Sequence, residues 1–525
     1  MNGRVRKRHA ISTHPQSISA LETNPTLTLR RVGLQTYGEY VAFLSSKCRA
    51  YKPESFVNIN KIEVCGPGGR TIIATLNIVE NGDLLDPNSL GLSSNAFAAL
   101  GAREETQVAI NLARPPRSMD FVRSKVRGET LRADQIKEII TDIAAHRYSK
   151  TEIAAFIVAS AAFLTGDEVL ALTQAMADVG TRISWKKAPC NFTTVMDKHC
   201  VGGVPGDRTS MIVVPIVAAC GLPIPKTSSR AITSPAGTAD TMEVLANVDV
   251  DLVQMQQIVG AHKGCLVWGG HVNLSPADDV LISVERPLSI DTPEQMVASI
   301  LSKKAAAGST HLLIDIPVGP SAKVRSSAEA ARLTKLFNFV GRAMGIEVDV
   351  LVTDGSQPIG NGIGPALEAR DVMAVLRNDP TAPADLRERA IQLAGRILEF
   401  DPSLKGGAGI PLARQKLANG DALAKMQKIM AAQGPAPKEV VLGDHLREIC
   451  SGSSGRVTQI DCERIGRIAR LAGAPISKGA GIDLLKKVGD PVKAGEPLYR
   501  IHAAVDTDFI FATEMAHDTP GYDIR

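Results

Sequence analysis

The chain has 525 residues, of which 44% are hydrophobic and 22% charged, and its net charge is +4. These proportions are typical of a globular protein with about three or four domains and argue against global disorder. Aromatic residues make up only 4%, too few to stack nucleic-acid bases, and no apolar run reaches the roughly 20 residues of a membrane helix. We therefore expect a protein that binds neither a nucleic-acid polymer nor a membrane.

The N-terminal sequence MNGRVRKRHA is basic, and no apolar segment follows it. We expect residues 1–25 to be a disordered basic tail rather than a secretory signal. The eight cysteines are scattered, without a CxxC pair or a Cys/His pair at zinc spacing. This usage is typical of reduced thiols, so we predict a cytoplasmic location and no metal site.

Residues 26–115 are predicted to form a β-rich domain, and residues 116–185 a helical one. The first contains the β-like segments LTLRRVGL, FVNINKIEVCG, RTIIATLNIV and TQVAINLA, separated by turn sequences. In the second, isoleucines at 136, 139, 140 and 143 have the spacing of one buried helix face. The pairs Ser149/Glu152 and Thr165/Glu168 form capping boxes. We expect residues 284–308 to return to this helical domain.

From residue 186 to 440, apolar β-like runs alternate with helical stretches. The runs HLLIDIPVG (311–319) and IEVDVLVTDG (346–355) are typical of buried strands. The alternation predicts a large α/β domain with a mixed sheet. In residues 441–525, GIDLLKKVGDPVKAGEPLYRI predicts two strands joined by tight turns, in a small α+β C-terminal domain. The predicted fold class is multidomain α/β.

The glycine-rich segment DKHCVGGVPGDRTS (197–210) precedes the apolar run MIVVPIVAACG. A glycine loop before a helix gathers backbone N–H groups at the positive end of the helix dipole, which suits an anion. Lys198 adds a positive charge, and Thr209 and Ser210 add hydroxyl donors. The segment predicts either a phosphate site or a structural tight turn, and it lacks the GK[ST] ending of a Walker loop.

The segment TSSRAITSPAGTADT (227–241) gathers hydroxyl side chains around Arg230. Buried hydroxyls need hydrogen-bond partners, so this is either a loop that binds a polar ligand or a solvated loop. The cluster IGNGIG (359–364) lacks the G-x-G-x-x-G spacing, so we expect no nicotinamide site. His199 and His271 have no partner at metal-ligand spacing, and we expect structural roles for them.

Asp291 immediately precedes a predicted helix that begins with a Thr292/Gln295 capping box. Four-residue steps place Gln295, Ser299 and Lys303 on one face of that helix, which either contacts a ligand or is simply solvated. Lys323 follows the predicted strand 311–319, and ligands bind at the carboxyl ends of strands in open α/β sheets. A single lysine there is weak evidence by itself.

In combination, four segments strongly resemble the thymidine and pyrimidine-nucleoside phosphorylase family over about residues 117–505. They are KHCVGGVPGDRTS, TSSRAITSPAGTADTMEVL, ASILSKKAAAG and QPIGNGIGPALEA. The β-rich N-terminal domain, with SRAITS and VGPSAK, looks like the branch that holds archaeal AMP phosphorylases and bacterial proteins described as thymidine phosphorylases. The resemblance implies a helical domain facing a large α/β domain, a substrate cleft with phosphate on the α/β side, and a homodimer or larger homo-oligomer.

The resemblance also implies a role for individual residues. The positions that match phosphate contacts are Lys198, Ser210, Ser228 and Thr238. Those that match contacts to the nucleobase in thymidine phosphorylases are Ser299 and Lys303. Those that match nucleotide contacts in the AMP-cleaving branch are Gly203, Ser229, Arg230, Ala231, Ile232, Thr233, Ser234, Thr238, Ser299 and Lys323. Asp291 matches the proton donor.

Three positions depart from the pattern of thymidine phosphorylases. Cys200 stands where they usually carry a serine that donates to phosphate, and a thiol is a weak donor. Pro205 is an insertion that is typical of the AMP-type branch. Arg286 is two residues out of register with the arginine that contacts the base. The departure at Arg286 weakens the case for thymine recognition, and the departure at Cys200 weakens the case for that phosphate contact.

The expected reaction is phosphorolysis, in which inorganic phosphate attacks the anomeric carbon through a transition state of oxocarbenium character while the base leaves. Asp291 could protonate the base if burial raises its pKa. No cofactor or metal is required. The substrate is a nucleoside, with thymidine as the family default, or a nucleoside 5′-monophosphate such as AMP, which would yield ribose 1,5-bisphosphate. A non-catalytic carrier or assembly protein is a remote alternative, because the C-terminal domain resembles biotinyl and lipoyl carriers but lacks their Met-Lys-Met tripeptide.

Overall fold

The structure is a computed structural model that describes residues 25–36, 38–53, 61–80, 83–187, 189–231, 234–272 and 274–525. The predicted basic tail lies outside these residues, except for Pro25. The chain divides into two compact units. One unit comprises Met1–Leu131, Glu138–Ala162 and Asp279–Ile290, and the other comprises Arg132–Lys137, Phe163–Asp278 and Asp291–Arg525. The segment predicted to return to the helical domain, 284–308, is divided between the two units.

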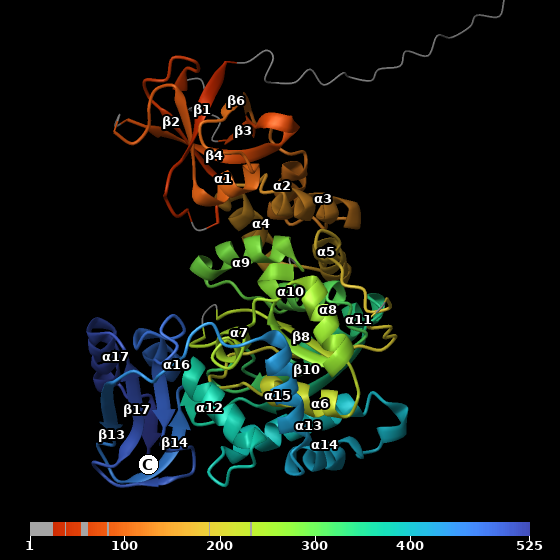
Figure 1. Cartoon of the computed structure of the whole chain (residues 1–525), viewed down its shortest axis with the longest axis vertical. Coiled ribbons are helices and arrows are strands. Elements are labelled where there is room, and N and C mark those ends of the chain that lie inside the picture. The colour runs from red at the N-terminus through yellow and green to blue at the C-terminus, as the bar shows by residue number, and fades with distance from the viewer. Residues whose placement is uncertain are drawn as a thin grey trace, which may run out of the picture. The chain divides into compact units, whose positions relative to one another are not determined.

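A closed six-stranded barrel forms the N-terminal part of the first unit, with the strand order β1-β5-β2-β4-β3-β6. The strands are β1 (Thr26–Arg31), β2 (Val41–Ser45), β3 (Lys61–Cys65), β4 (Thr71–Val79), β5 (Ser89–Leu92) and β6 (Gln107–Leu112), drawn in red to orange in Figure 1. Alternating buried residues such as Leu27 and Leu29 fill its core. Strands β1, β3, β4 and β6 lie in the predicted β-like segments. Strands β2 and β5 were not predicted, because they are short and lack an alternating pattern.

Helices α2 (Ser118–Val126) and α4 (Lys150–Ala162) follow the barrel in the same unit. The predicted capping box at Ser149 is confirmed, because the Glu152 carboxylate accepts a hydrogen bond from the Ser149 amide and the Glu152 amide donates to the Ser149 hydroxyl. Lys61 of β3 pairs with Glu152 and donates to the carbonyl oxygen of Arg147 at 2.7 Å. These contacts attach the start of α4 to the barrel.

Two small parallel sheets form the centre of the second unit. One has the order β11-β10-β7, from β7 (Met196–Cys200), β10 (His311–Val318) and β11 (Glu347–Asp354), and the other pairs β8 (Ile224–Ser228) with β9 (Gly264–Trp268). Helix α6 (Ser210–Ala219) packs into a large apolar cluster, with every residue buried from Ser210 to Ala218. As predicted for an α/β domain, parallel strands alternate with helices.

Further helices before the C-terminal part are α1 (Ser94–Leu100), α3 (Ala133–Ala144), α5 (Gly166–Asp178), α7 (Thr238–Met242), α8 (Leu252–His262), α9 (Pro276–Leu288), α10 (Pro293–Ala306), α11 (Ser327–Ala343), α12 (Pro365–Leu376), α13 (Ala384–Leu398), α14 (Gly409–Ala418) and α15 (Asp421–Gln433). Helix α5 begins after the predicted capping box of Thr165 with Glu168, and α10 after Thr292, which accepts from the Gln295 amide. Both predicted helix starts are confirmed.

The C-terminal part of the second unit contains β13 (His445–Cys450), β14 (Gly455–Ile460), α16 (Cys462–Leu471), β15 (Gly481–Leu484), β16 (Pro491–Val492), β17 (Pro497–Ala503), α17 (Asp506–Asp518) and β18 (Tyr522–Ile524). The prediction of two strands over 481–501 was wrong, because the turn sequence between them contains the short strand β16. Strand β12 (Gly362–Ile363) pairs with β15, so the α/β part contributes an edge strand to the C-terminal sheet.

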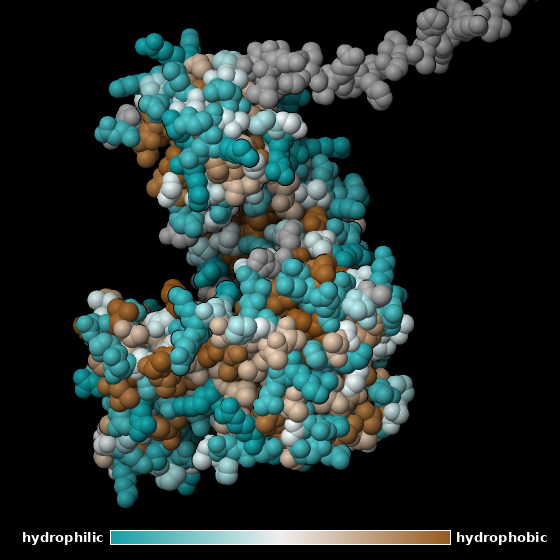
Figure 2. Space-filling view, in the orientation of Figure 1, coloured by the Kyte–Doolittle hydropathy of each residue, from teal (hydrophilic) through white to brown (hydrophobic). Residues whose placement is uncertain are grey.

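No helix in the described part of the chain combines the length and apolarity that crossing a bilayer requires. The face seen in Figure 2 is a mosaic of hydrophilic and hydrophobic residues. This agrees with a mean hydropathy near zero, +0.03.

The exposed edge of β9 is completed by a side chain rather than by a strand. The buried Gln433 amide accepts from the Leu266 N–H at 2.8 Å and donates to the carbonyl oxygens of Leu266 at 3.0 Å and Asn247 at 2.7 Å. A backbone polar group buried without a partner costs about 1–3 kcal/mol. Gln433 therefore connects the end of α15 to the sheet.

We predict that Gln433→Leu lowers the free energy of unfolding by about 1–3 kcal/mol for each backbone group that it leaves unpaired. Gln415→Leu, at an exposed position of α14, is the matched control and should change stability little. Thermal melting of both variants beside the parent chain measures the difference. Equal melting temperatures for the two variants would show that the Gln433 amide is not required.

Candidate active site

The glycine-rich loop 201–209 connects β7 to α6 at the carboxyl edge of the parallel sheet. Gly202, Gly203 and Gly206 all have positive φ, between 77° and 96°. A Cβ on Gly203 would lie 2.4 Å from the Lys323 amide nitrogen, and one on Gly206 would lie 2.1 Å from the Ile359 carbonyl oxygen. Only glycine permits both this backbone conformation and this close approach. The loop is thus held between two neighbouring loops and leads directly into the N-terminus of α6.

The Lys198 ammonium is buried beneath this loop. Its side chain is 2% exposed, and Nζ donates to Thr209 Oγ1 at 2.8 Å. Thr209 Oγ1 in turn donates to Asp207 Oδ1 at 2.6 Å, and Asp315 Oδ2 of β10 lies 3.6 Å from Nζ. The Lys198 ammonium therefore has two carboxylates and one hydroxyl around it. Thr209, which carries this hydroxyl, immediately precedes Ser210, the first residue of α6.

Electrostatics keeps this lysine charged in spite of its burial. Burial lowers the pKa of Lys198, but the Asp207 and Asp315 carboxylates outweigh it, and the net pKa lies above the ordinary value. Burial raises the pKa of Asp207, yet the Lys198 charge and the hydrogen bonds from Cys200 and Thr209 bring it well below its ordinary range. Burial raises the pKa of Asp315. A permanent positive charge thus lies at the start of α6, where the helix dipole adds to it.

Cys200, Asp207 and Asp315 bring three possible metal ligands within 4.8 Å of one another, which residue spacing did not reveal. Two observations argue that these groups serve Lys198 instead. The Lys198 ammonium lies among them, and like charges at such distances repel strongly in a buried site. Burial and the Asp207 charge also raise the pKa of the Cys200 thiol well above its ordinary value, and this thiol donates a hydrogen bond to Asp207. The acids are the counter-ions of the buried lysine.

The second predicted loop, 229–237, follows β8 and precedes α7. Arg208 of the glycine-rich loop joins the two loops, because its guanidinium donates to the Ala236 carbonyl oxygen at 2.6 Å and to Thr238 Oγ1 at 3.4 Å. Ser228 ends β8 and donates to the Val267 carbonyl oxygen at 3.3 Å. The structure therefore places Ser228 and Thr238 on either side of this loop. Ile232 and Thr233 lie outside the described residues.

Arg230 carries a carboxylate partner of its own. Its guanidinium donates to both oxygens of Glu243, at 2.7 and 2.8 Å, and lies 3.4 Å from Asp240 Oδ1. It also lies over the Trp268 ring, 5.0 Å from the centroid. Ser229 and Ser234 are exposed, and Ser234 Oγ donates to the Ala236 carbonyl oxygen at 2.9 Å. Glu243 therefore neutralises the charge of Arg230 in this structure.

Ser299 and Lys303 lie together on α10, as their spacing predicted. Lys303 Nζ donates to Ser299 Oγ at 3.1 Å and to Asp278 Oδ2 at 2.7 Å. Asp278 is buried, and the sequence gave no reason to single it out. The three side chains form a set of donors and acceptors of the kind that recognises the polar edge of a base.

Asp291 and Lys323 form an ion pair, with 2.5 Å between Oδ2 and Nζ. Their side chains are 45% and 39% exposed. The condition set for Asp291 as a proton donor was burial, and this structure does not meet it. The Lys323 ammonium also occupies the Asp291 Oδ2 atom, which would have to carry the proton. Asp291 could donate a proton only after Lys323 has moved to another anion.

On the opposite face of β7, positive charges gather around His199. Lys304 Nζ pairs with Asp197 Oδ2 at 2.8 Å, and the neighbouring Lys226 is buried with Nζ 3.2 Å from the Thr227 carbonyl oxygen. Burial lowers the pKa of Lys226 well below its ordinary value, and the Lys304 charge lowers it further. Burial and the charges of Lys304, Lys226, Lys303 and Lys198 likewise lower the pKa of His199 well below its usual range. His199 is thus held as a neutral imidazole.

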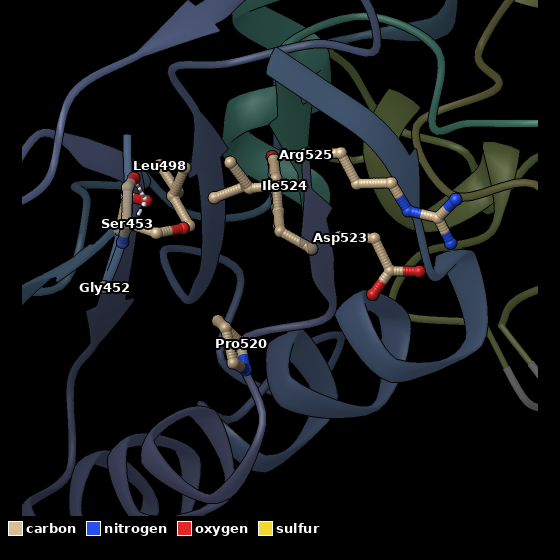
Figure 3. A pocket seen from close by; sticks show the side chains of 9 residues that line it. Gly452, Ser453, Leu498, Pro520, Asp523, Ile524 and Arg525 are labelled. Carbon is tan, nitrogen blue, oxygen red and sulfur yellow. Dashed lines mark hydrogen bonds between the residues drawn. The ribbon is translucent and has the colours of Figure 1, made fainter. Parts of the chain in front are cut away.

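A cavity of about 410 Å³ lies elsewhere in the C-terminal part, between residues 451–453 and 520–525. Figure 3 shows the side chains of Asp523 and Arg525 directed away from Gly452 and Ser453. None of the predicted site residues lines this cavity. The candidate active site is therefore the set of loops around Lys198.

Three family models match the chain. They are the glycosyl transferase family helical bundle domain at residues 119–180, the glycosyl transferase family a/b domain at 193–423, and the pyrimidine nucleoside phosphorylase C-terminal domain at 456–521. Proteins described as "Putative thymidine phosphorylase" are similar over nearly their whole length. The one from Rhodopseudomonas palustris is 56% identical over 96% of this chain and 97% of its own, and the one from Albidiferax ferrireducens is 54% identical over 94% and 95%.

The chain belongs to the thymidine and pyrimidine-nucleoside phosphorylase family. The enzyme is a pentosyltransferase. A solved structure, anthranilate phosphoribosyltransferase from Thermus thermophilus, shares the fold with a TM-score of 0.50 and 18% identity, over 60% of this chain and 99% of its own.

Several charged residues of the phosphorylase site were missed in the sequence. Asp315 had a detectable signal, a carboxylate inside the otherwise apolar run LLIDI, because an acid is almost never fully buried without a partner. Lys226 had a similar signal, because it directly follows the apolar segment LPIP. Asp278 and Glu243 had none, because each meets its partner only through the tertiary fold.

We predict that Lys226→Met raises the melting temperature at pH 7 and that this gain shrinks as the pH approaches 10. Folding lowers the pKa of the Lys226 amine. At pH values below about 10.4, the unfolded chain therefore binds this proton more readily than the folded chain does, and this difference destabilises the fold. Methionine removes that penalty. The control is Lys438→Met at an exposed position. A Lys226→Met variant less stable than the parent chain at both pH values would contradict this.

Proposed function

We propose that this enzyme cleaves the N-glycosidic bond of a nucleoside with inorganic phosphate, with thymidine as the family default substrate. The observation that carries the proposal is the buried, charged Lys198 beneath a glycine-rich loop at the start of α6. A fixed ammonium, backbone N–H groups and a helix N-terminus together suit a phosphate dianion. The relatives described as thymidine phosphorylases support the choice of substrate.

In the proposed reaction an oxygen of phosphate forms a bond to the anomeric carbon, and the bond between that carbon and the base nitrogen breaks. The electron pair of the broken bond leaves with the base, which takes up a proton. Lys198 and the hydroxyls of Ser210, Ser228 and Thr238 hold the phosphate, so catalysis is mainly positioning and electrostatics. Cys200 contributes little to phosphate binding, because its thiol donates to Asp207.

The base would lie against Ser299 and Lys303, whose donors are already oriented by Asp278. Asp291 would supply the proton once Lys323 has released it. This order links proton donation to the arrival of an anion, since a phosphate group near Gly203 offers Lys323 an alternative partner. It also explains why an acid so exposed in the ligand-free chain could act as an acid during turnover.

A nucleoside 5′-monophosphate is the second candidate substrate. The main chain of Lys323 lies against Gly203, and Arg230 is in the loop that Arg208 joins to the glycine-rich loop, so both residues belong to loops next to the proposed phosphate site. Each is now paired with an acid, Asp291 or Glu243, that a substrate phosphate would have to displace.

The cytoplasmic location and the homo-oligomeric state remain predictions. Because the chain is a pentosyltransferase, the alternative of a non-catalytic carrier or assembly protein no longer applies.

We predict that Lys198→Met raises the KM for phosphate and lowers kcat together. The variant loses a charge next to a dianionic nucleophile, and such contacts contribute roughly 2–4 kcal/mol to transition-state stability. Steady-state kinetics at varied phosphate measures both constants. Wild-type phosphate kinetics in this variant would place the phosphate elsewhere.

We predict that Lys323→Met separates the two candidate substrates. If the substrate is a monophosphate, the parent enzyme should prefer it to the matching nucleoside by more than about tenfold, because one charge-assisted contact contributes about 1.5–3 kcal/mol, and Lys323→Met should abolish that preference. A panel of thymidine, uridine, AMP, CMP and UMP at equal phosphate measures this. Faster cleavage of thymidine than of every monophosphate, unchanged by Lys323→Met, would leave thymidine as the substrate.

For either substrate, Asp291→Asn should reduce kcat about 10²–10⁴-fold and leave KM nearly unchanged, the usual effect of removing a general acid. Unchanged turnover with a slightly lower melting temperature would mean that Asp291 only stabilises the start of α10.

A further inference from the structure

One lysine of the C-terminal part reaches the loop 229–237. Lys478 lies between α16 and β15, and its Nζ is 3.0 Å from both Asp240 Oδ1 and Glu243 Oε2. Its main chain is fixed to the α/β part, because the Lys478 carbonyl oxygen accepts from the Ala366 N–H at 3.0 Å and β15 pairs with β12. The ammonium therefore approaches the two acids from a rigid support.

The same two acids determine the shape of the loop. Asp240 Oδ2 accepts from the main-chain N–H groups of Ala231 at 2.6 Å and Gly237 at 3.0 Å, which are the two sides of the loop. Glu243 holds the guanidinium of Arg230 through two hydrogen bonds. A Cβ on Gly237 would lie 2.6 Å from the Ser229 carbonyl oxygen, so the loop closes tightly on itself.

The charges of this group balance only when Lys478 is present. Two carboxylates, Asp240 and Glu243, face two cations, Arg230 and Lys478. Hydrogen bonding from Arg230, followed by the contact with Lys478, lowers the pKa of Glu243 to about 2, so this acid is ionised. Without Lys478, Arg230 would face both carboxylates alone, and Asp240 would turn from the loop amides toward Arg230.

We propose that Lys478 is a positioning residue through which the C-terminal part of the chain sets the loop 229–237 for binding of the pentosyl substrate. By holding Asp240 and Glu243, Lys478 leaves Arg230 able to exchange Glu243 for a polar or anionic group of the substrate. No buried carboxylate is then left without a counter-ion during the exchange. The proposal rests on the proposed function for the identity of the substrate, but the fixing of the loop does not depend on it.

The test compares Lys478→Met with Lys478→Arg and with Asp483→Asn. Asp483 of β15 pairs with Arg370 of α12 at 2.8 Å, so Asp483→Asn also weakens the attachment of the C-terminal part but does not touch the loop. We expect Lys478→Met to raise the KM for the pentosyl substrate about tenfold, as the loss of a charge-assisted contact does, with the KM for phosphate unchanged. Lys478→Arg should restore the KM, and Asp483→Asn should leave it unchanged.

Hydrogen–deuterium exchange of the peptide that covers 229–238 tests the same point without substrate. Exchange in Lys478→Met should be about tenfold faster than in the parent chain and in Asp483→Asn, because the Ala231 and Gly237 amides lose their shared acceptor. Equal exchange in Lys478→Met and Asp483→Asn would overturn the proposal. So would equal KM values in these two variants. Absence of phosphorolysis in the parent enzyme would overturn the proposed function alone, since the exchange result would still decide the role of Lys478.

Discussion

The proposed phosphate site depends on one buried ammonium. Lys198 is almost inaccessible to solvent, and it remains charged because Asp207, Asp315 and Thr209 surround it. These partners come from the loop after β7 and from β10, the adjacent parallel strand. Removing a charge from water costs several kcal/mol, and only such a set of partners offsets it. The parallel sheet, the glycine-rich loop and the start of α6 can all be understood as the support for this charge.

The same arrangement recurs around the site, where each candidate cation carries an acid. Lys303 pairs with Asp278, Lys323 with Asp291, and Arg230 with Glu243. An anionic substrate therefore does not enter an empty basic pocket but exchanges partners with carboxylates that are already present. Such exchange lowers net affinity, and it favours ligands whose charge and shape satisfy several cations at once. In the proposed reaction, that competition would set the specificity of the site.

The sequence predicted the elements that have a regular apolar pattern. The runs that became β10 and β11, the capping boxes at Thr165 and Ser149, and the shared face of Ser299 and Lys303 follow from local chemistry. Strands β2, β5 and β16 were missed because they are short and their pairing partners are remote in the sequence. A strand of this kind is defined by its neighbours rather than by its own residues.

The electrostatic partners were missed for a related reason. These ion pairs form between loops that only the fold brings together. They are Asp291 with Lys323, Arg230 with Glu243, and Lys478 with both Asp240 and Glu243. The residue types predicted an anion site, but only the three-dimensional arrangement shows which of its cations are already neutralised. Burial was the condition for Asp291 as a proton donor, and the structure shows its side chain exposed just before α10.

The most direct test of the central claim is a crystal structure of the enzyme with bound arsenate, located by its anomalous scattering. Arsenate has the shape and charge of phosphate, so its arsenic atom marks the nucleophile site. The account predicts a single strong peak beside the glycine-rich loop, with oxygens within hydrogen-bond distance of Lys198 Nζ and Ser210 Oγ. An arsenic peak in contact only with Arg230 or Lys323, and no peak beside Lys198, would contradict this prediction.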